Sequence, residues 1–121
     1  MKSVYLAGGM KGNWQDVVKE LVPNNIYYDP RSHKLDDPKE YTEWDLKHVE
    51  DADIIFAYME TSNPSGYGMC IEIGWAYNSG KTIIFVNEQV GRKWNMVNEC
   101  CNYVTDNFED GIQHLREITQ K

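Results

Sequence analysis

Glu72 is the residue whose type and setting most directly suggest chemistry in this chain. It is the one carboxylate in the otherwise apolar run 69–76, which follows a glycine-rich turn. Its neighbours Ile71, Ile73 and Trp75 are expected to be buried, and a charge buried among them is costly unless it is paired or functional. The run is typical of a helix start, where the dipole favours an ionised carboxylate. Glu72 is therefore a candidate nucleophile.

Two structural explanations for Glu72 compete with this one. A glutamate in the first helical turn can simply complement the dipole, and a glutamate on the polar side of a helix can be solvated. A capping box is excluded, because Met69 stands three residues before Glu72, where that motif needs serine or threonine. The residues alone leave both a functional and a structural role open.

Asp45 and Tyr5 are the candidate partners of Glu72. Asp45 shares a helical face with Tyr41, Val49 and Ala52, so its carboxylate can point toward the sheet; the alternative is a solvated aspartate at the edge of that stripe. The hydroxyl of Tyr5 can hold a carboxylate by a hydrogen bond. Core packing is the alternative for a tyrosine in a strand.

A glycine-rich loop, residues 8–12, follows the first apolar run. Gly8, Gly9 and Gly12 allow the backbone to approach a ligand closely, although a tight strand-to-helix turn explains them equally well. The spacing matches neither a phosphate-binding P-loop nor a dinucleotide fingerprint. Lys11 can meet a phosphate or lie on the surface as a solvated lysine.

Other common catalytic patterns are missing from the sequence. His33, His48 and His114 show no base–nucleophile spacing, and no Gly-x-Ser-x-Gly elbow occurs. The three cysteines suggest neither a disulfide framework nor a zinc site, and Cys70 is interpreted as a small core residue. This cysteine usage indicates a reduced, cytoplasmic protein.

Strand-like and helix-like segments alternate along the chain. Strands are expected at residues 4–7, 26–28, 53–58, 82–86 and 103–104, and helices at 14–22, 39–51, 68–78, 93–101 and 109–119. Residues 31–38 are expected to form a polar loop, and Asp53 to serve as a turn or capping group. The alternation predicts a flavodoxin-like or Rossmann-like parallel sheet of about five strands with helices on both faces. Ligands bind such sheets beyond the carboxyl ends of the strands, which brings the segments 8–12, 60–68 and 87–98 together.

The length and net charge of the chain limit the number of domains and the kinds of binding partner. A chain of 121 residues predicts one domain spanning residues 1–121. The net charge of −7 argues against a nucleic-acid polymer or an anionic membrane as partner, but not against a single nucleotide. The sequence has no apolar stretch long enough to span a membrane, and the segment 1–9 is too short for a signal peptide.

These residues together resemble the nucleoside 2-deoxyribosyltransferase family and its relatives, the deoxynucleoside 5'-monophosphate N-glycosidases. Four pieces match in order over nearly the whole chain: the first strand and loop 4–9, Asp45-Leu46 followed by Asp53, the glycine turn leading into Glu72-Ile73-Gly74-Trp75-Ala76, and residues 94–97.

The resemblance implies a role for each matching position. Glu72 would attack the anomeric carbon of a deoxyriboside, Tyr5 would position its carboxylate, and Asp45 would contact the sugar or assist proton transfer. Substrate would be bound by Gly8, Gly9, Met10, Lys11, Ser65, Gly66, Gly68, Asn95 and Val97. Asn95 and Val97 would serve a neighbouring subunit's site, so the resemblance implies a homodimer or a higher homo-oligomer. It implies no metal or organic cofactor.

The chain departs from the family pattern around the base. Two extra residues, Cys70 and Ile71, separate the glycine turn from Glu72, and residues 64–66 stand where the family has a base-contacting aspartate. Met10 and Lys11 replace an aromatic residue of the first loop. Ser65 and Lys11 could instead suit a 5'-phosphate, as in the hydrolase branch. We therefore expect cleavage of an N-glycosidic bond, with transfer to another base or to water. The alternatives are a non-catalytic nucleotide-binding or sensing module on the same fold and, more distantly, a flavodoxin-like electron carrier.

Overall fold

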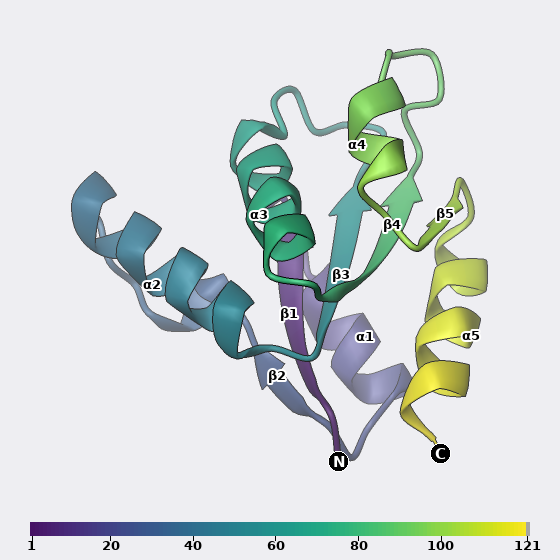
Figure 1. Ribbon diagram of the computed structural model, residues 1–121, viewed down its shortest axis with the longest axis horizontal. Coiled ribbons are helices and arrows are strands. Elements are labelled where there is room, and N and C mark those ends of the chain that lie inside the picture. Colours follow the sequence, from purple (N-terminus) through teal and green to yellow (C-terminus); the bar gives the residue numbers. More distant parts are fainter. Residues whose placement is uncertain (121) are drawn as a thin grey trace.

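The structure is a computed structural model and describes residues 1–120. A sheet of five parallel strands lies at its centre, in the order β2–β1–β3–β4–β5 (Figure 1). The strands are β1 (Ser3–Gly8), β2 (Ile26–Tyr28), β3 (Ile54–Met59), β4 (Thr82–Asn87) and β5 (Tyr103–Thr105). The parallel sheet predicted from the alternation of apolar runs and helical patterns is confirmed.

Helices cover both faces of this sheet (Figure 1). One face carries α2 (Pro38–Asp51), α3 (Tyr67–Asn78) and α4 (Asn95–Glu99), and the other carries α1 (Trp14–Leu21) and α5 (Phe108–Thr119). A short 3-10 helix, η1 (Pro30–Ser32), follows β2. Each predicted helix is present, with ends that differ from the predictions by a few residues.

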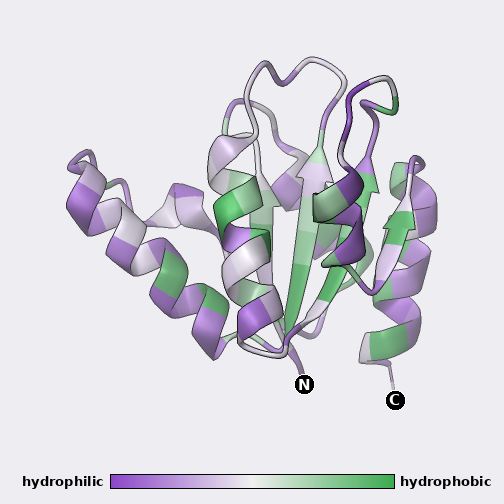
Figure 2. Cartoon of the chain, turned by 45° about the horizontal axis from the view of Figure 1, so that its top comes forward, coloured by the Kyte–Doolittle hydropathy of each residue, from purple (hydrophilic) through white to green (hydrophobic). Residues whose placement is uncertain are grey.

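Side chains alternate along the strands and divide the core into two layers. In β1, Tyr5 and Ala7 belong to the layer under α2 and α3, whereas Val4 and Leu6 belong to the layer over α1 and α5. Because both faces are covered, β3 and β4 are almost continuously apolar, as buried parallel strands are. Figure 2 shows these two strands mainly in the colours of hydrophobic residues.

The expected burial of Ile71 and Trp75 beside Glu72 is wrong. Ile71 is 61% exposed and Trp75 is also exposed. The helix α3 turns Met69, Ile73 and other residues at helical spacing toward the sheet, so apolar residues between them face outward. Glu72 itself lies on the buried side.

Two segments expected to be irregular have defined structural roles. The loop predicted at 31–38 begins inside the 3-10 helix η1. Asp53 lies in the bend before β3, in keeping with the expected turn, and caps no helix. Its carboxylate accepts hydrogen bonds from the Ser3 backbone N–H at 2.9 Å and from the Ser3 hydroxyl at 3.0 Å. Asp53 therefore joins the start of β1 to the start of β3.

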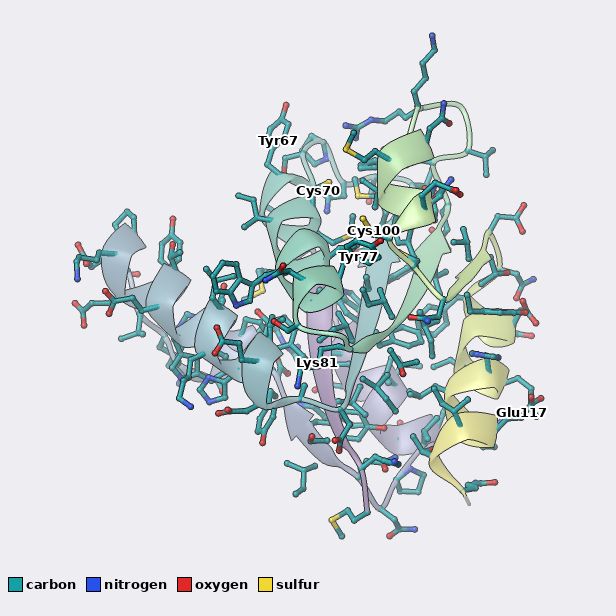
Figure 3. The ribbon with its side chains drawn as sticks, viewed as in Figure 1. Tyr67, Cys70, Tyr77, Lys81, Cys100 and Glu117 are labelled. Carbon is teal, nitrogen blue, oxygen red and sulfur yellow. The ribbon has the colours of Figure 1, made fainter. Side chains whose placement is uncertain are left out.

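The cysteines are free thiols. Cys70 of α3 and Cys100, which follows α4, lie where these two helices meet and pack against the core, as Figure 3 shows. Burial raises the pKa of the Cys70 thiol and raises that of Cys101 to about 12, which disfavours a reactive thiolate. Within residues 1–120 no cluster of three or more ligating side chains is suited to a metal ion. None of the helices in this part of the chain is long and apolar enough to cross a membrane.

Candidate active site

A large cavity lies at the carboxyl ends of β1 and β3. The strand β2 lies on one side of β1, and the chain then returns to place β3 on the other side. The strand order therefore reverses between β1 and β3. Parallel α/β sheets bind ligands at such a point. A cavity of about 910 Å³ occupies it and is bordered by the loops after β1 and β3, by residues of α2, and by the start of α3.

Glu72 lies on the wall of this cavity and is 8% exposed. The Tyr5 hydroxyl, which is fully buried in the sheet, donates a hydrogen bond of 2.6 Å to Glu72 Oε2. Tyr5 reaches it because the odd-numbered residues of β1 face α3. This hydrogen bond holds the Glu72 carboxyl in place on the cavity wall.

Asp45 brings a second carboxylate to the same wall. Its side chain is 20% exposed and lines the cavity with Glu72. Burial raises the pKa of Asp45, while the neighbouring Glu72, the His33 ring and Tyr5 oppose that rise. The position of Asp45 on the sheet-facing side of α2 was one of two alternatives, and the structure decides between them.

The electrostatics of Glu72 differ from the expectation. Burial raises the pKa of its carboxyl to about 8, Tyr5 opposes this change, and Asp45 adds to it. The helix dipole does not hold Glu72 ionised, because Glu72 lies beyond the first turn of α3, where the dipole effect fades. Two adjacent carboxyls in a partly dry site favour a state in which they hold one proton between them.

His33 approaches Asp45 from the segment after β2. Its Nδ1 accepts a hydrogen bond of 2.9 Å from the Leu35 N–H, so a neutral ring carries its proton on Nε2. That nitrogen lies 3.4 Å from Asp45 Oδ1, which is buried and accepts no hydrogen bond from the described residues. His33 also packs edge-on against the Trp44 ring, with a centroid distance of 4.8 Å.

A buried ionic network fixes this segment. Asp29 is buried and pairs with Arg31 and Lys19 at 2.7 and 2.8 Å. Its Oδ1 also accepts the Arg31 backbone N–H at 3.0 Å and so caps η1. Hydrogen bonds from these cations lower the pKa of Asp29, although burial works against them. The network holds η1 so that His33 reaches the cavity.

The glycine loop after β1 forms another wall. The Gly9 carbonyl accepts hydrogen bonds of 2.9 Å from both Trp14 Nε1 and Gln15 Nε2. Gly8 has a φ of 151°, and a Cβ on it would lie 2.4 Å from the Tyr58 carbonyl oxygen. Only glycine fits at that position, so the close backbone approach inferred from sequence has a structural basis as well. Gly8, Gly9, Met10 and Lys11 all line the cavity.

The turn before α3 closes the cavity on the Glu72 side. Gly66 has a φ of 89° and stands at the N-cap of α3, and no side chain caps this end. Ser65, Gly66 and Gly68 line the cavity. Backbone N–H groups at an uncapped helix start suit an anionic or hydroxylic group.

The chain has relatives in both sequence and fold. A family model described as "Nucleoside 2-deoxyribosyltransferase like" matches residues 1–90. The chain belongs to this family. No curated protein matches the sequence.

Solved structures with the same fold include two deoxyribosyltransferases. That of Bacillus psychrosaccharolyticus has a TM-score of 0.71 at 20% identity, over 89% of this chain and 88% of its own. That of Leishmania mexicana has a TM-score of 0.75 at 17% identity, over 98% and 99%. A CMP N-glycosidase from Clostridium botulinum has a TM-score of 0.66 at 22% identity, over 94% and 98%. At these identities the solved structures show a shared fold, and the family model carries the assignment to the family.

Two residues carried over from the deoxyribosyltransferase family lie away from this cavity. Asn95 borders a separate hollow of about 270 Å³ beside Trp94 and Arg92. Val97 packs against the core layer under α4. Within one chain neither residue joins Glu72.

Several residues on the cavity wall were not singled out from the sequence. They come from the segment after β2, from α2 and from the loop after β3: Pro30, His33, Leu35, Tyr41, Glu60 and Asn63. The sequence shows no base–nucleophile pattern for His33, but Asp45, 12 positions later, lies beside it in space. The placement of residues 60–68 at the strand ends was the one available signal for Glu60 and Asn63.

Proposed function

We propose that this protein cleaves the N-glycosidic bond of a 2'-deoxynucleoside or its 5'-monophosphate through a covalent ester on Glu72. One observation carries the proposal. A buried tyrosine hydroxyl holds Glu72 at 2.6 Å beside a second carboxylate, Asp45, on the wall of the cavity at the strand-order reversal. Family membership supports the reaction class.

The carboxyl pair supplies both roles that the first step needs. When the one proton that the pair holds passes from Glu72 to Asp45, ionised Glu72 attacks C1' of the sugar while the Asp45 carboxyl gives that proton to the departing base. The C1'–N bond breaks, its electron pair leaves with the base, and the new bond joins C1' to a Glu72 oxygen. Positive charge that develops on the sugar is stabilised by the adjacent carboxylate.

The second step reverses these roles. Asp45, now ionised, removes a proton from water or from a second base, which attacks C1' and releases Glu72. Two displacements at one carbon retain its configuration. Tyr5 keeps one oxygen of Glu72 occupied throughout, so the other oxygen remains the attacking atom.

The cavity also offers features suited to the 5' end of a nucleotide. Lys11 and Ser65 border it, together with the uncapped start of α3. These groups favour a phosphate or a free hydroxyl. They support a monophosphate N-glycosidase as well as a nucleoside transferase.

We further propose that the protein works as a homodimer or a higher homo-oligomer. The outward side of α3 exposes Tyr67 at 73% and Ile71 at 61%, and neighbouring α4 exposes Met96 at 82%. Figure 3 shows Tyr67 projecting away from the end of α3. Such clustered apolar exposure favours burial against another copy. That contact would bring Asn95 and Val97 toward a neighbouring subunit's cavity.

A product assay tests the reaction. The protein is incubated with each 2'-deoxynucleoside or its 5'-monophosphate, with and without a different free base, and the products are separated by chromatography. Exchange of bases identifies a transferase, and release of base with free sugar or sugar phosphate identifies a hydrolase. Tight nucleotide binding without turnover, unchanged in Glu72→Gln, would instead support a non-catalytic binding module.

A further inference from the structure

Glu60 and Asn63 border the cavity beside the glycine loop and have no part in the chemistry described above. A Cβ on Gly9 would lie 2.9 Å from Glu60 Oε1 and 3.2 Å from Asn63 Nδ2. The two polar groups therefore lie close together against the same face of Gly9, an approach that a side chain at position 9 would obstruct. All three residues line the same cavity as Glu72.

The orientation of the Asn63 amide is fixed by its own turn. Its Oδ1 accepts a hydrogen bond of 3.1 Å from the Ser65 backbone N–H. The Nδ2 group is therefore the end directed at Gly9, and it donates to no described residue. The Glu60 backbone carbonyl is held as well, by the Asn63 N–H at 3.1 Å and by Gln89 Nε2 at 2.6 Å.

The Glu60 carboxylate has unused acceptor capacity. Within residues 1–120 it accepts no hydrogen bond, and no cation lies within ion-pair distance of it. Burial and the nearby Glu88 raise its pKa, in keeping with partial removal from water. Glu88 differs from Glu60, because its oxygens accept hydrogen bonds from the Tyr58 hydroxyl at 2.7 Å and from the Thr61 backbone N–H at 3.1 Å.

An acceptor beside a donor is complementary to one kind of nucleobase edge. Cytosine and adenine present an amino group next to an unprotonated ring nitrogen, so they donate and accept side by side. Uracil, thymine and hypoxanthine present an oxygen next to a ring N–H, which reverses the pattern. A base of the second kind would leave Glu60 facing an oxygen and Asn63 Nδ2 facing an N–H.

We propose that Glu60 and Asn63 read the base and select substrates that carry cytosine or adenine over their oxo counterparts. This inference rests on the proposed N-glycosidic cleavage at the same cavity. Glu60 accepts from the exocyclic amino group, and Asn63 Nδ2 donates to the ring nitrogen.

Two matched substrate pairs test the proposal: 2'-deoxycytidine against 2'-deoxyuridine, and 2'-deoxyadenosine against 2'-deoxyinosine, each also as the 5'-monophosphate. We expect kcat/KM for the amino member to exceed that for the oxo member by about 10- to 100-fold in at least one pair. A larger kcat/KM ratio in the cytidine–uridine pair indicates a pyrimidine site, and a larger ratio in the adenosine–inosine pair indicates a purine site. Equal kcat/KM within both pairs would overturn the proposal and leave the proposed reaction intact.

Variants make the test specific to these two residues. Glu60→Gln should lower the amino preference, and the double variant Glu60→Gln with Asn63→Asp should reverse it, because donor and acceptor then exchange places. Asp at position 63 can still accept the Ser65 N–H. Glu88→Gln is the matched control, and it should leave the ratio unchanged. An unaltered ratio in the double variant would also contradict the proposal.

Failure of the reaction itself is distinguishable from failure of base selection. If the wild-type protein turns over none of these compounds, calorimetric titration with the same pairs reports selection directly. Tighter binding of the amino member by the wild type, lost in Glu60→Gln, would uphold base reading without catalysis. Equal binding, or none, would overturn it.

Discussion

Glu72 lies where burial and a second carboxyl oppose its ionisation and a tyrosine hydroxyl favours it. The outcome is a pKa of about 8, well above that of a glutamate in water. A nucleophile with a raised pKa is protonated more often at neutral pH, but its ionised form is more basic and therefore more reactive. Pairing with Asp45 allows the displaced proton to remain in the site.

Replacing Glu72 by glutamine should abolish turnover. The amide keeps the shape of the side chain and can still accept the Tyr5 hydrogen bond, but it cannot form the glycosyl ester. We expect a loss of at least about 10³-fold in kcat. Single-turnover assays on the purified variant, with circular dichroism to verify the fold, would check this. Activity near the wild-type level would remove Glu72 from the nucleophile role.

The same substitution should change how stability depends on pH. In the unfolded chain Glu72 loses its proton near the ordinary glutamate pKa of 4.5, whereas in the fold it does so at about 8. The unfolded state therefore releases this proton first, and the wild type loses stability as pH rises from about 5 to 8. Between pH 5 and pH 8 the free energy of unfolding of Glu72→Gln should therefore rise by about 2–4 kcal/mol relative to that of the wild type.

Urea unfolding at pH 5 and pH 8 measures this difference. Glu117→Gln, at an exposed glutamate on α5 (Figure 3), serves as the control and should follow the wild type. Parallel pH profiles for Glu72→Gln and the wild type would mean that Glu72 is not desolvated as described.

Replacing Tyr5 by phenylalanine should reduce activity and move its pH dependence. The hydroxyl lowers the pKa of Glu72, so its removal raises that pKa and shifts the rising limb of kcat/KM to higher pH. A hydrogen bond to a charged group is typically strong enough that we expect a loss of about 10- to 100-fold at neutral pH. A uniform loss at all pH values would indicate a purely structural effect.

The elements around the site differ in how they hold their residues. Tyr5 lies in a central strand and Glu72 in a long helix, so regular hydrogen bonding fixes both backbones. His33 follows a single 3-10 turn, which is held largely by the ionic contacts of Asp29 with Arg31 and Lys19. This segment is the part of the site that depends most on a few side chains.

Asp29→Ala should therefore raise KM and lower the free energy of unfolding. Arg31 and Lys19 would lose their shared buried partner, and we expect a stability loss of about 2–3 kcal/mol at neutral pH. Because the pKa of Asp29 is lowered in the fold, this contribution disappears when acid protonates the carboxylate. Urea unfolding and KM measure the two effects. Asp36→Ala, at an exposed loop position, is the control.

At the scale of the whole molecule, the helices α3 and α4 expose large apolar side chains. Tyr67 and Ile71 of α3 and Met96 of α4 are exposed on the side that also carries Asn95. If this surface joins subunits, Ile71→Asp should dissociate them, because an aspartate buried at an interface has no partner. Light scattering after size exclusion measures the mass, and Leu21→Asp on α1 is the control. A monomeric wild type would refute the assembly.

The sequence by itself determined the fold and singled out Glu72 as a candidate. Apolar runs and helical spacing are local properties, and a chain that alternates them has few ways to bury both patterns other than a covered parallel sheet. Glu72 was identifiable because it is a charged residue in an otherwise apolar helical segment, where burial of an unpaired charge is costly. The glycines after the first strand were identifiable because their lack of a side chain is itself a local property.

Only the tertiary structure decided which of these residues lie together. The positions of His33 and Glu60 on the cavity wall depend on where η1 and the loop after β3 come to lie, and no local pattern encodes that. The outward position of Ile71 follows from the packing of α3 on the sheet. The raised pKa of Glu72 arises from burial and from the proximity of Asp45, 27 positions earlier in the sequence, because solvation and Coulomb interactions depend on distances in space.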